Sequence, residues 1–166
     1  SYEARKCGVR SAMPMRTAMR LCPQAVRVAP DFGKYRRVSR AINDIFHEYT
    51  DLVEPVALDE AYLDVTYNKA DIPFGHRVAR MIKGEIRSEL KLTASAGVAP
   101  NKFLAKIASD LRKPDGLVAV MPHQVTEFLV DLPVEVIPGV GKVTREQLRR
   151  VGIDTVGQLA ARSPPQ

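Results

Sequence analysis

The chain has 166 residues and a formal net charge of +6, with 45% hydrophobic and 27% charged residues, which is ordinary for a soluble globular protein. No apolar run approaches the roughly 18 residues that span a bilayer, and we do not expect the start to be a signal peptide. The two cysteines, Cys7 and Cys22, have no metal-like spacing and fit reduced thiols in a cytoplasmic protein.

The charge is unevenly distributed along the chain. Residues 1–40 carry ten Lys and Arg against two acids, residues 41–132 ten against fourteen, and residues 133–166 five against three. A basic head, an acidic middle and a mildly basic tail fit a protein that holds polyanions around a metal-binding centre. A solvated surface with accidental asymmetry is the alternative.

Apolar spacing and turn residues predict the order of the secondary structure. We expect short helices and turns over residues 1–33, a helix over 34–49, strands over 52–58 and 61–65, a helix over 75–90, a strand over 92–98, a helix capped by Asn101 with Phe103, Leu104, Ile107 and Leu111 inward, and a strand over 117–121. This order predicts an α+β fold, a mostly antiparallel sheet with helices on one face.

Three carboxylates lie in the otherwise apolar run from residue 57 to residue 64, ALDEAYLD. Burying an ionised carboxylate is costly unless it is paired or bound to metal, so a divalent cation is the obvious partner. Neighbours on a regular strand point to opposite faces, so Asp59 and Glu60 share an ion only if the chain bends there, as at a tight hairpin. An exposed acidic turn is the alternative that this run leaves open.

The tail contains a Pro-Gly-x-Gly-Lys segment within IPGVGK, residues 137–142, before a predicted helix over 143–151 and a shorter one over 155–161. This pattern looks like a helix–hairpin–helix motif, because glycines admit close approach of the backbone and N–H groups at a helix start hydrogen-bond phosphate. A tight turn without that function is the alternative. The residues expected to bind the nucleic-acid backbone, without base specificity, are Gly139, Gly141, Lys142 and Arg145.

Further motifs recur in a fixed order along the chain: YEARK at 2–6 with GVR at 8–10, LDEAYLD at 58–64, ASAGVA at 94–99, KFLAKIASD at 102–110, KPDG at 113–116 and IPGVG at 137–141. In this order and spacing they closely resemble the Y-family translesion DNA polymerases, specifically the DinB or DNA polymerase IV branch. The resemblance covers nearly the whole chain.

This resemblance implies a palm-type sheet, with residues 1–31 forming part of a small helical fingers region, 32–120 most of the palm and 121–166 part of an all-α helix–hairpin–helix thumb. It implies low-fidelity, template-directed DNA synthesis past damaged bases, by nucleotidyl transfer to a primer 3′-hydroxyl. The implied partners are primer–template DNA, deoxynucleoside triphosphates and a sliding clamp for the longer protein. The implied location is the bacterial cytoplasm, at the nucleoid when on DNA.

The resemblance also implies a metal site. Asp59 and Glu60 match the family's second metal-binding cluster, where two Mg²⁺ ions activate the primer hydroxyl and stabilise the leaving pyrophosphate. The residue types agree with this assignment, because Mg²⁺ prefers hard oxygen ligands and is usually held by few carboxylates plus substrate phosphates. Asp59 and Glu60 are therefore the expected catalytic residues.

Three other residues match positions that contact the triphosphate of the incoming nucleotide, namely Tyr2, Arg5 and Lys113. A packed tyrosine, a surface arginine and a turn lysine are the alternatives for them. Asp64 has a weaker claim to metal and is expected to be structural or hydrogen-bonding. Lys106 is expected on the exposed face of its helix and receives no role.

The family's polymerases begin with a strand that bears the first metal-binding aspartate, followed by an aromatic steric gate, and they end beyond the thumb in a little finger. We expect none of these in this chain, which opens at Ser1 inside the fingers. Losing one of the carboxylates that bridge the metal ions should cost several kcal/mol of transition-state stabilisation, and each 1.36 kcal/mol lowers the rate about tenfold. We therefore expect little or no polymerase activity from the chain by itself.

Two rival functions remain on the sequence alone. A non-catalytic DNA-binding module predicts salt-dependent DNA binding without nucleotide chemistry. A palm-like metal-dependent nucleotidyl cyclase would use Asp59 and Glu60 without DNA, and the hairpin motif of the tail argues against it.

Overall fold

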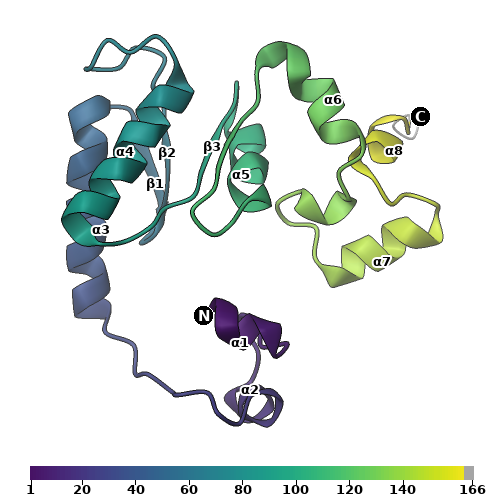
Figure 1. Cartoon of the computed structure of the whole chain (residues 1–166). Helices are drawn as coiled ribbons and strands as arrows, with labels where there is room; N and C mark the ends of the chain where they lie inside the picture. The colour runs from purple at the N-terminus through teal and green to yellow at the C-terminus, as the bar shows by residue number, and fades with distance from the viewer. Residues whose placement is uncertain (163–166) are drawn as a thin grey trace. The chain divides into compact units, whose positions relative to one another are not determined.

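The computed structural model describes residues 1–162, which divide into two compact units at Lys34, and each unit is described by itself. The first unit holds α1 (Tyr2–Lys6) and α2 (Met15–Leu21) (Figure 1). Both of its cysteines are free thiols, as the sequence predicted. None of the helices within residues 1–162 is long and apolar enough to cross a membrane.

The second unit contains a strand-and-helix region followed by a wholly helical one (Figure 1). Its elements are α3 (Phe32–Tyr49), which begins just before the boundary, β1 (Val53–Ala57), β2 (Glu60–Leu63), α4 (Gly75–Leu90), β3 (Ala96–Val98), α5 (Lys102–Leu111), β4 (Leu117–Ala119), the 3₁₀ turn η1 (Pro122–Gln124), α6 (Val125–Val130), the 3₁₀ turn η2 (Val134–Val136), α7 (Lys142–Arg150) and α8 (Val156–Ala160).

The predicted order of helices and strands through β4 is confirmed, and local chemistry explains the best-placed boundaries. α4 ends where Lys91 adopts a left-handed conformation, φ 56°. α5 begins because the Asn101 side chain accepts a hydrogen bond from the backbone N–H of Leu104 at 2.9 Å. The prediction that Phe103 and Leu111 face inward is wrong, since both are exposed. Their spacing placed them at the edge of the apolar stripe, which α5 buries only along its centre.

The main hydrophobic core lies between α3, α4 and β2, and Figure 1 shows α3 and α4 beside the β1–β2 pair. Its buried members come from the helices, and partly buried side chains such as Leu63 and Val65 close it from the strand side. The buried members are Ile45, Tyr49, Val78, Ile82 and Ile86. This core fixes the hairpin that carries the two adjacent carboxylates.

The pairing of the strands differs from the expected mostly antiparallel sheet. β1 and β2 pair antiparallel, whereas β3 and β4 pair parallel, and the described residues form two separate two-stranded sheets. The parallel pair follows from connectivity: α5 carries the chain from the end of β3 back to the start of β4, as a parallel crossover requires. Apolar spacing within short strands does not reveal such a partner.

The expectation of helices on one face of the sheet is also wrong. A Cβ at Gly97 would lie 2.0 Å from the carbonyl oxygen of Ala105, so this side of β3 faces α5. The next residue, Val98, lies against Gly75 at the start of α4. Because successive strand residues point to opposite faces, α4 and α5 cover opposite faces of β3.

Tyr49 makes a testable polar contact in the core. It is 8% exposed, and its hydroxyl donates a hydrogen bond to Oε2 of Glu85 at 2.9 Å. Burial, reinforced by the Glu85 carboxylate, raises the pKa of Tyr49 to about 12. An unfolded tyrosine has a pKa of about 10, so the stability contributed by the neutral phenol is complete below pH 10 and is lost as the pH rises to 12.

We expect Tyr49→Phe to flatten the fall in the free energy of unfolding between pH 10 and pH 12, because the ionising group is removed. Urea denaturation followed by circular dichroism across this range measures the effect. Tyr67→Phe is the matched control, since Tyr67 is 94% exposed. Equal pH slopes for both variants would contradict the prediction.

Candidate active site

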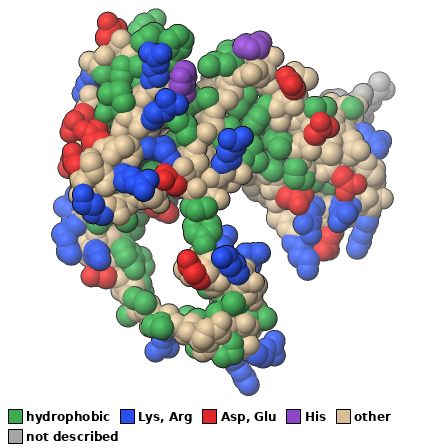
Figure 2. All heavy atoms as spheres, viewed as in Figure 1, with side chains coloured by type: hydrophobic (Ala, Val, Ile, Leu, Met, Phe, Trp, Pro, Cys, Tyr) green, Lys and Arg blue, Asp and Glu red, His purple; other side chains and the backbone are tan. Residues whose placement is uncertain are grey.

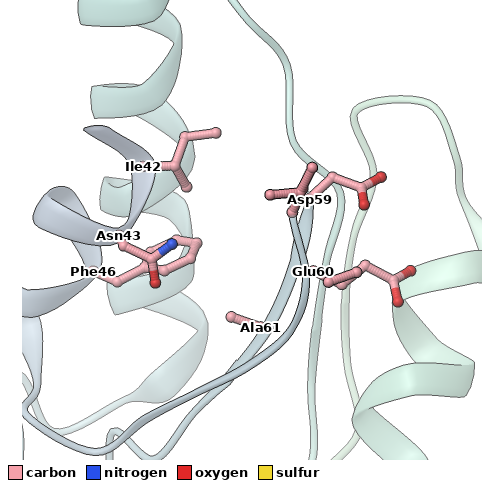
Figure 3. A pocket seen from close by; sticks show the side chains of 8 residues that line it. Ile42, Asn43, Phe46, Asp59, Glu60 and Ala61 are labelled. Atoms are coloured by element: carbon pink, nitrogen blue, oxygen red, sulfur yellow. The ribbon is translucent and has the colours of Figure 1, made fainter. Parts of the chain in front are cut away.

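The two adjacent carboxylates lie at the tip of the β1–β2 hairpin. Ala57 pairs with Glu60 across a register shift that follows Pro55, and Asp59 lies in the two-residue turn between the strands. The bend that the sequence required at this point is therefore confirmed. Figure 3 shows both carboxylates extending to the same side of the hairpin, away from α3. The turn thus presents Asp59 and Glu60 together.

A small hollow lies behind this turn, between α3 and the hairpin (Figure 3). It is lined on the helix side by Ile42, Asn43 and Phe46, and on the other side by residues 57–61. The hairpin tip is therefore backed by largely apolar side chains while its carboxylates project the other way. The carboxylates therefore project toward the α5 side of the hairpin.

α5 lies on the carboxylate side of the hairpin and pairs its lysines with it. Nζ of Lys106 donates to Oε1 of Glu60 at 2.5 Å, and this hydrogen bond raises the pKa of Lys106. One turn earlier, Lys102 forms an ion pair with Glu54 and lies 5.8 Å from the centroid of the Tyr62 ring. The expectation that Lys106 lies on the exposed face of its helix is wrong, because its side chain is only 26% exposed.

Lys113 follows the end of α5, in the segment KPDG at 113–116, here called the KPDG turn. Its Nζ lies 2.5 Å from Oδ1 of Asp110, while Oδ2 of the same carboxylate lies 3.8 Å from Nζ of Lys106. Sequence reasoning missed Asp110, although part of the signal was present: Lys106 and Asp110 have the i, i+4 spacing of one helix face, and Lys113 follows three residues later, beyond the end of α5. The partner on the hairpin could not be found from spacing.

The backbone of the KPDG turn is held from α4. Nζ of Lys83 lies 2.6, 2.9 and 3.0 Å from the carbonyl oxygens of Ala94, Asp115 and Gly116 and 2.8 Å from Oδ1 of Asp115, so its three N–H donors are shared among four acceptors. Arg87 reaches the other carboxylate oxygen of Asp115 at 3.2 Å. The hydrogen bond from Lys83 lowers the pKa of Asp115. Two cations on one helix therefore anchor the turn that carries Lys113.

Asp64, the third carboxylate of the acidic run, has a local structural role. Its Oδ1 accepts a hydrogen bond from the backbone N–H of Thr66 at 2.9 Å, and hydrogen bonding by Thr66 lowers the pKa of Asp64. Its own carbonyl oxygen accepts a hydrogen bond from the buried Thr50 hydroxyl at 2.7 Å. The expected hydrogen-bonding role of Asp64 is thus confirmed.

Tyr2 and Arg5 belong to the first unit and are described within it. They lie one turn apart on α1, with the Arg5 guanidinium carbon 5.9 Å from the centroid of the Tyr2 ring. Ser1 caps this helix by accepting a hydrogen bond from Ala4 N–H at 3.3 Å. The two side chains that the resemblance pairs are therefore neighbours on one helix face.

The glycine-rich segment of the tail precedes α7. Gly139 has φ +93°, a left-handed conformation that favours glycine, and Gly141 caps α7 with an extended backbone. A Cβ on either glycine would meet no atom within 4 Å. Lys142 begins the helix, and Arg145 lies 3.4 Å from Glu135 of η2. Figure 2 shows Lys and Arg side chains gathered over α7, with acidic ones among them.

The residues at the hairpin tip fit a divalent cation by their chemistry. Asp59 and Glu60 offer hard oxygen donors on one side of a turn, which suits Mg²⁺, an ion usually held by one or two carboxylates plus substrate phosphates. Within residues 1–162 no group of three or more His, Cys, Asp or Glu side chains is assembled to hold a metal. The site is therefore a two-carboxylate site, suited to an ion that also takes ligands from elsewhere.

Residues 1–110 match the impB/mucB/samB family. DNA polymerase IV of Xanthomonas campestris pv. campestris is 58% identical over 162 residues, which are 98% of this chain and 45% of that protein. DNA polymerase IV of Neisseria meningitidis serogroup A is 57% identical over 159 residues, 96% of this chain and 45% of that protein. The chain spans about half the length of the curated relatives it matches.

Solved structures give the same picture. DinB from Sulfolobus solfataricus superimposes with a TM-score of 0.91 at 38% identity, covering 98% of this chain and 48% of that one. The insertion ternary complex of Dbh DNA polymerase gives 0.87 at 38% identity, with the same two coverages. Fold, motifs and relatives agree: the chain belongs to the impB/mucB/samB family of Y-family DNA polymerases, in its DinB branch.

Proposed function

We propose that this chain is part of a template-directed DNA polymerase that copies damaged DNA with low fidelity, joining a deoxynucleotide to a primer 3′-hydroxyl. The observation that carries the proposal is the pair of carboxylates, Asp59 and Glu60, presented on one side of the hairpin turn. Relatives at 57–58% identity are named DNA polymerase IV, which supports this chemistry over other uses of a two-carboxylate site.

In this proposal Asp59 and Glu60 hold two Mg²⁺ ions with the help of a further carboxylate. When bound, the ions activate the primer hydroxyl and neutralise the leaving pyrophosphate. Lys113 contributes positive charge to the triphosphate from the far end of α5, and Tyr2 and Arg5 contribute from the fingers. Phosphoryl transfer rests on positioning and charge neutralisation, which these side chains are chemically suited to supply.

The proposed organisation follows the family, with fingers over residues 1–31, palm over 32–120 and thumb over 121–166. In the thumb, Gly139 and Gly141 would let the DNA backbone approach the start of α7, while Lys142 and Arg145 supply charge. The proposed partners are primer–template DNA, deoxynucleoside triphosphates and, for the longer protein, a sliding clamp. Its proposed place is the nucleoid of a bacterial cytoplasm.

We also propose that the 166-residue chain alone extends no primer. Its described residues assemble only two carboxylates at the candidate site. In addition, each strand of the two separate pairs, β1–β2 and β3–β4, has one edge without a hydrogen-bonded strand among those residues, which leaves room for further strands. A polymerase site would therefore need structure from a longer protein.

A chimaera tests the proposed function. In it, this chain replaces the matching segment of the Xanthomonas polymerase, and the product is assayed for Mg²⁺-dependent primer extension on a primed template. We expect extension by the chimaera and none by the 166-residue chain. A folded chimaera that binds DNA without extending the primer would favour the non-catalytic DNA-binding module. The predicted inactivity of the isolated chain would be refuted if that chain extended a primer and Asp59→Ala abolished the extension.

A further inference from the structure

A chain of ion pairs connects the hairpin tip to the KPDG turn. It starts at Glu60, passes to Lys106 at 2.5 Å, continues to Asp110 at 3.8 Å and ends at Lys113 at 2.5 Å. Lys106 and Asp110 belong to α5, Lys113 follows the end of that helix, and Glu60 reaches Lys106 from the hairpin. It therefore joins the carboxylate proposed to hold metal to the ammonium proposed to meet the triphosphate.

Stability does not account for this arrangement. The side chains of Lys106, Asp110 and Lys113 are 26%, 49% and 39% exposed. Ion pairs with such exposure contribute little to folding, because solvent screens the attraction and ordering the long side chains costs entropy. A role in placing charge explains better why one carboxylate, Asp110, contacts two different ammonium groups.

The two supports of Lys113 act on different parts of it. Lys83 holds the backbone of the KPDG turn through the carbonyl oxygens of Asp115 and Gly116. Asp110 holds the Lys113 side chain, whose ammonium sits on a flexible four-carbon stem. Removing the Asp110 charge should therefore free the ammonium while the turn stays in place.

We propose that Asp110 is a positioning residue that holds the Lys113 ammonium for the phosphates of a nucleoside triphosphate, and that Lys106 ties Asp110 to Glu60. The proposal rests on the proposed function, since it takes Lys113 as the phosphate contact. It predicts that Asp110 acts on nucleotide binding only through Lys113. Ordering Lys113 before the nucleotide arrives lowers the entropy cost of binding, so the effect should fall on nucleotide affinity more than on the chemical step.

A double-mutant cycle in the chimaera tests this. The dissociation constant of a complementary deoxynucleoside triphosphate is measured in Mg²⁺ on a dideoxy-terminated primer, where no bond forms, and KM and kcat are measured on an extendable primer. We expect Asp110→Asn to raise the dissociation constant and KM about tenfold, while kcat stays within about twofold of the value for the unsubstituted chimaera. Asp110→Glu, which keeps the negative charge, should raise the dissociation constant and KM less than Asp110→Asn does. In a Lys113→Ala background, Asp110→Asn should change nothing further.

The control is Asp51→Asn, because Asp51 also pairs with a lysine at 2.5 Å but lies outside the ion-pair chain. It should leave the nucleotide affinity and both kinetic constants unchanged. The positioning role is overturned if Asp110→Asn leaves the affinity for the nucleotide unchanged or lowers kcat alone. It is also overturned if Asp110→Asn weakens nucleotide binding by the same factor in the Lys113→Ala background as in the unchanged chimaera. If Lys113→Ala itself does not weaken binding, the assignment of Lys113 in the proposed function fails and the positioning role fails with it. A chimaera that extends primers while Asp110→Asn has no effect overturns the positioning role alone.

Discussion

Replacing Asp59 or Glu60 by alanine in the chimaera is expected to lower kcat for primer extension by at least about 1000-fold, which corresponds to about 4 kcal/mol of transition-state stabilisation. The hairpin turn presents both carboxylates on one side, and each would hold cations that carry the charge of the reacting phosphates. Single-nucleotide incorporation under saturating substrate measures the change. Because the two side chains serve one site, losing either should be nearly as damaging as losing both.

The matched control for this prediction is Glu54→Ala. Glu54 is a carboxylate on the same hairpin and also pairs with a lysine of α5, but it lies away from the turn. It should retain near-normal kcat, while all three variants keep their affinity for primed DNA. A comparable loss of kcat in Glu54→Ala would mean that the hairpin responds to any lost ion pair, and the special role of the turn carboxylates would be refuted.

The hairpin tip was predictable from sequence because its determinants are local. Two carboxylates between strand-like segments require a bend if they are to share an ion, and the turn at Leu58 and Asp59 supplies it. The bounds of α4 and the cap at Asn101 were predictable for the same reason, since apolar spacing and capping act within a few residues. These features needed no knowledge of what packs against them.

The remaining features depend on contacts between distant segments. Glu60 and Lys106 are 46 residues apart, so their pairing exists only because α5 lies over the hairpin. The parallel pairing of β3 with β4 likewise depends on where the crossover returns the chain. Lys83 holds the KPDG turn, 32 residues later, through a backbone carbonyl oxygen, and side-chain patterns do not predict contacts to the backbone. Residue spacing therefore identified the candidate metal ligands, Asp59 and Glu60, but not the distant lysines that pair with Glu60 and hold the KPDG turn.

Among the glycines of the described residues, an added Cβ would come closest to a neighbouring atom at Gly97, where β3 packs against α5. A Cβ there would lie 2.0 Å from the carbonyl oxygen of Ala105 and 2.5 Å from the backbone nitrogen of Ser109, so α5 would have to move away from β3. Overpacking against rigid backbone cannot be relieved by a rotamer change. We expect Gly97→Ala to lower the free energy of unfolding by at least about 3 kcal/mol, measured by urea denaturation of the 166-residue chain.

Gly84→Ala is the matched control, because Gly84 lies inside α4 and an added Cβ would meet nothing within 4 Å. Alanine in a helix interior is favoured over glycine, so this variant should raise the free energy of unfolding by about 0.5–1 kcal/mol. The same chemical change is thus expected to act with opposite sign at two positions. In the chimaera, Gly97→Ala should also lower primer extension, since α5 carries Lys106 and leads into Lys113. Normal stability and activity in this variant would show that β3 and α5 do not pack as closely as the structure places them.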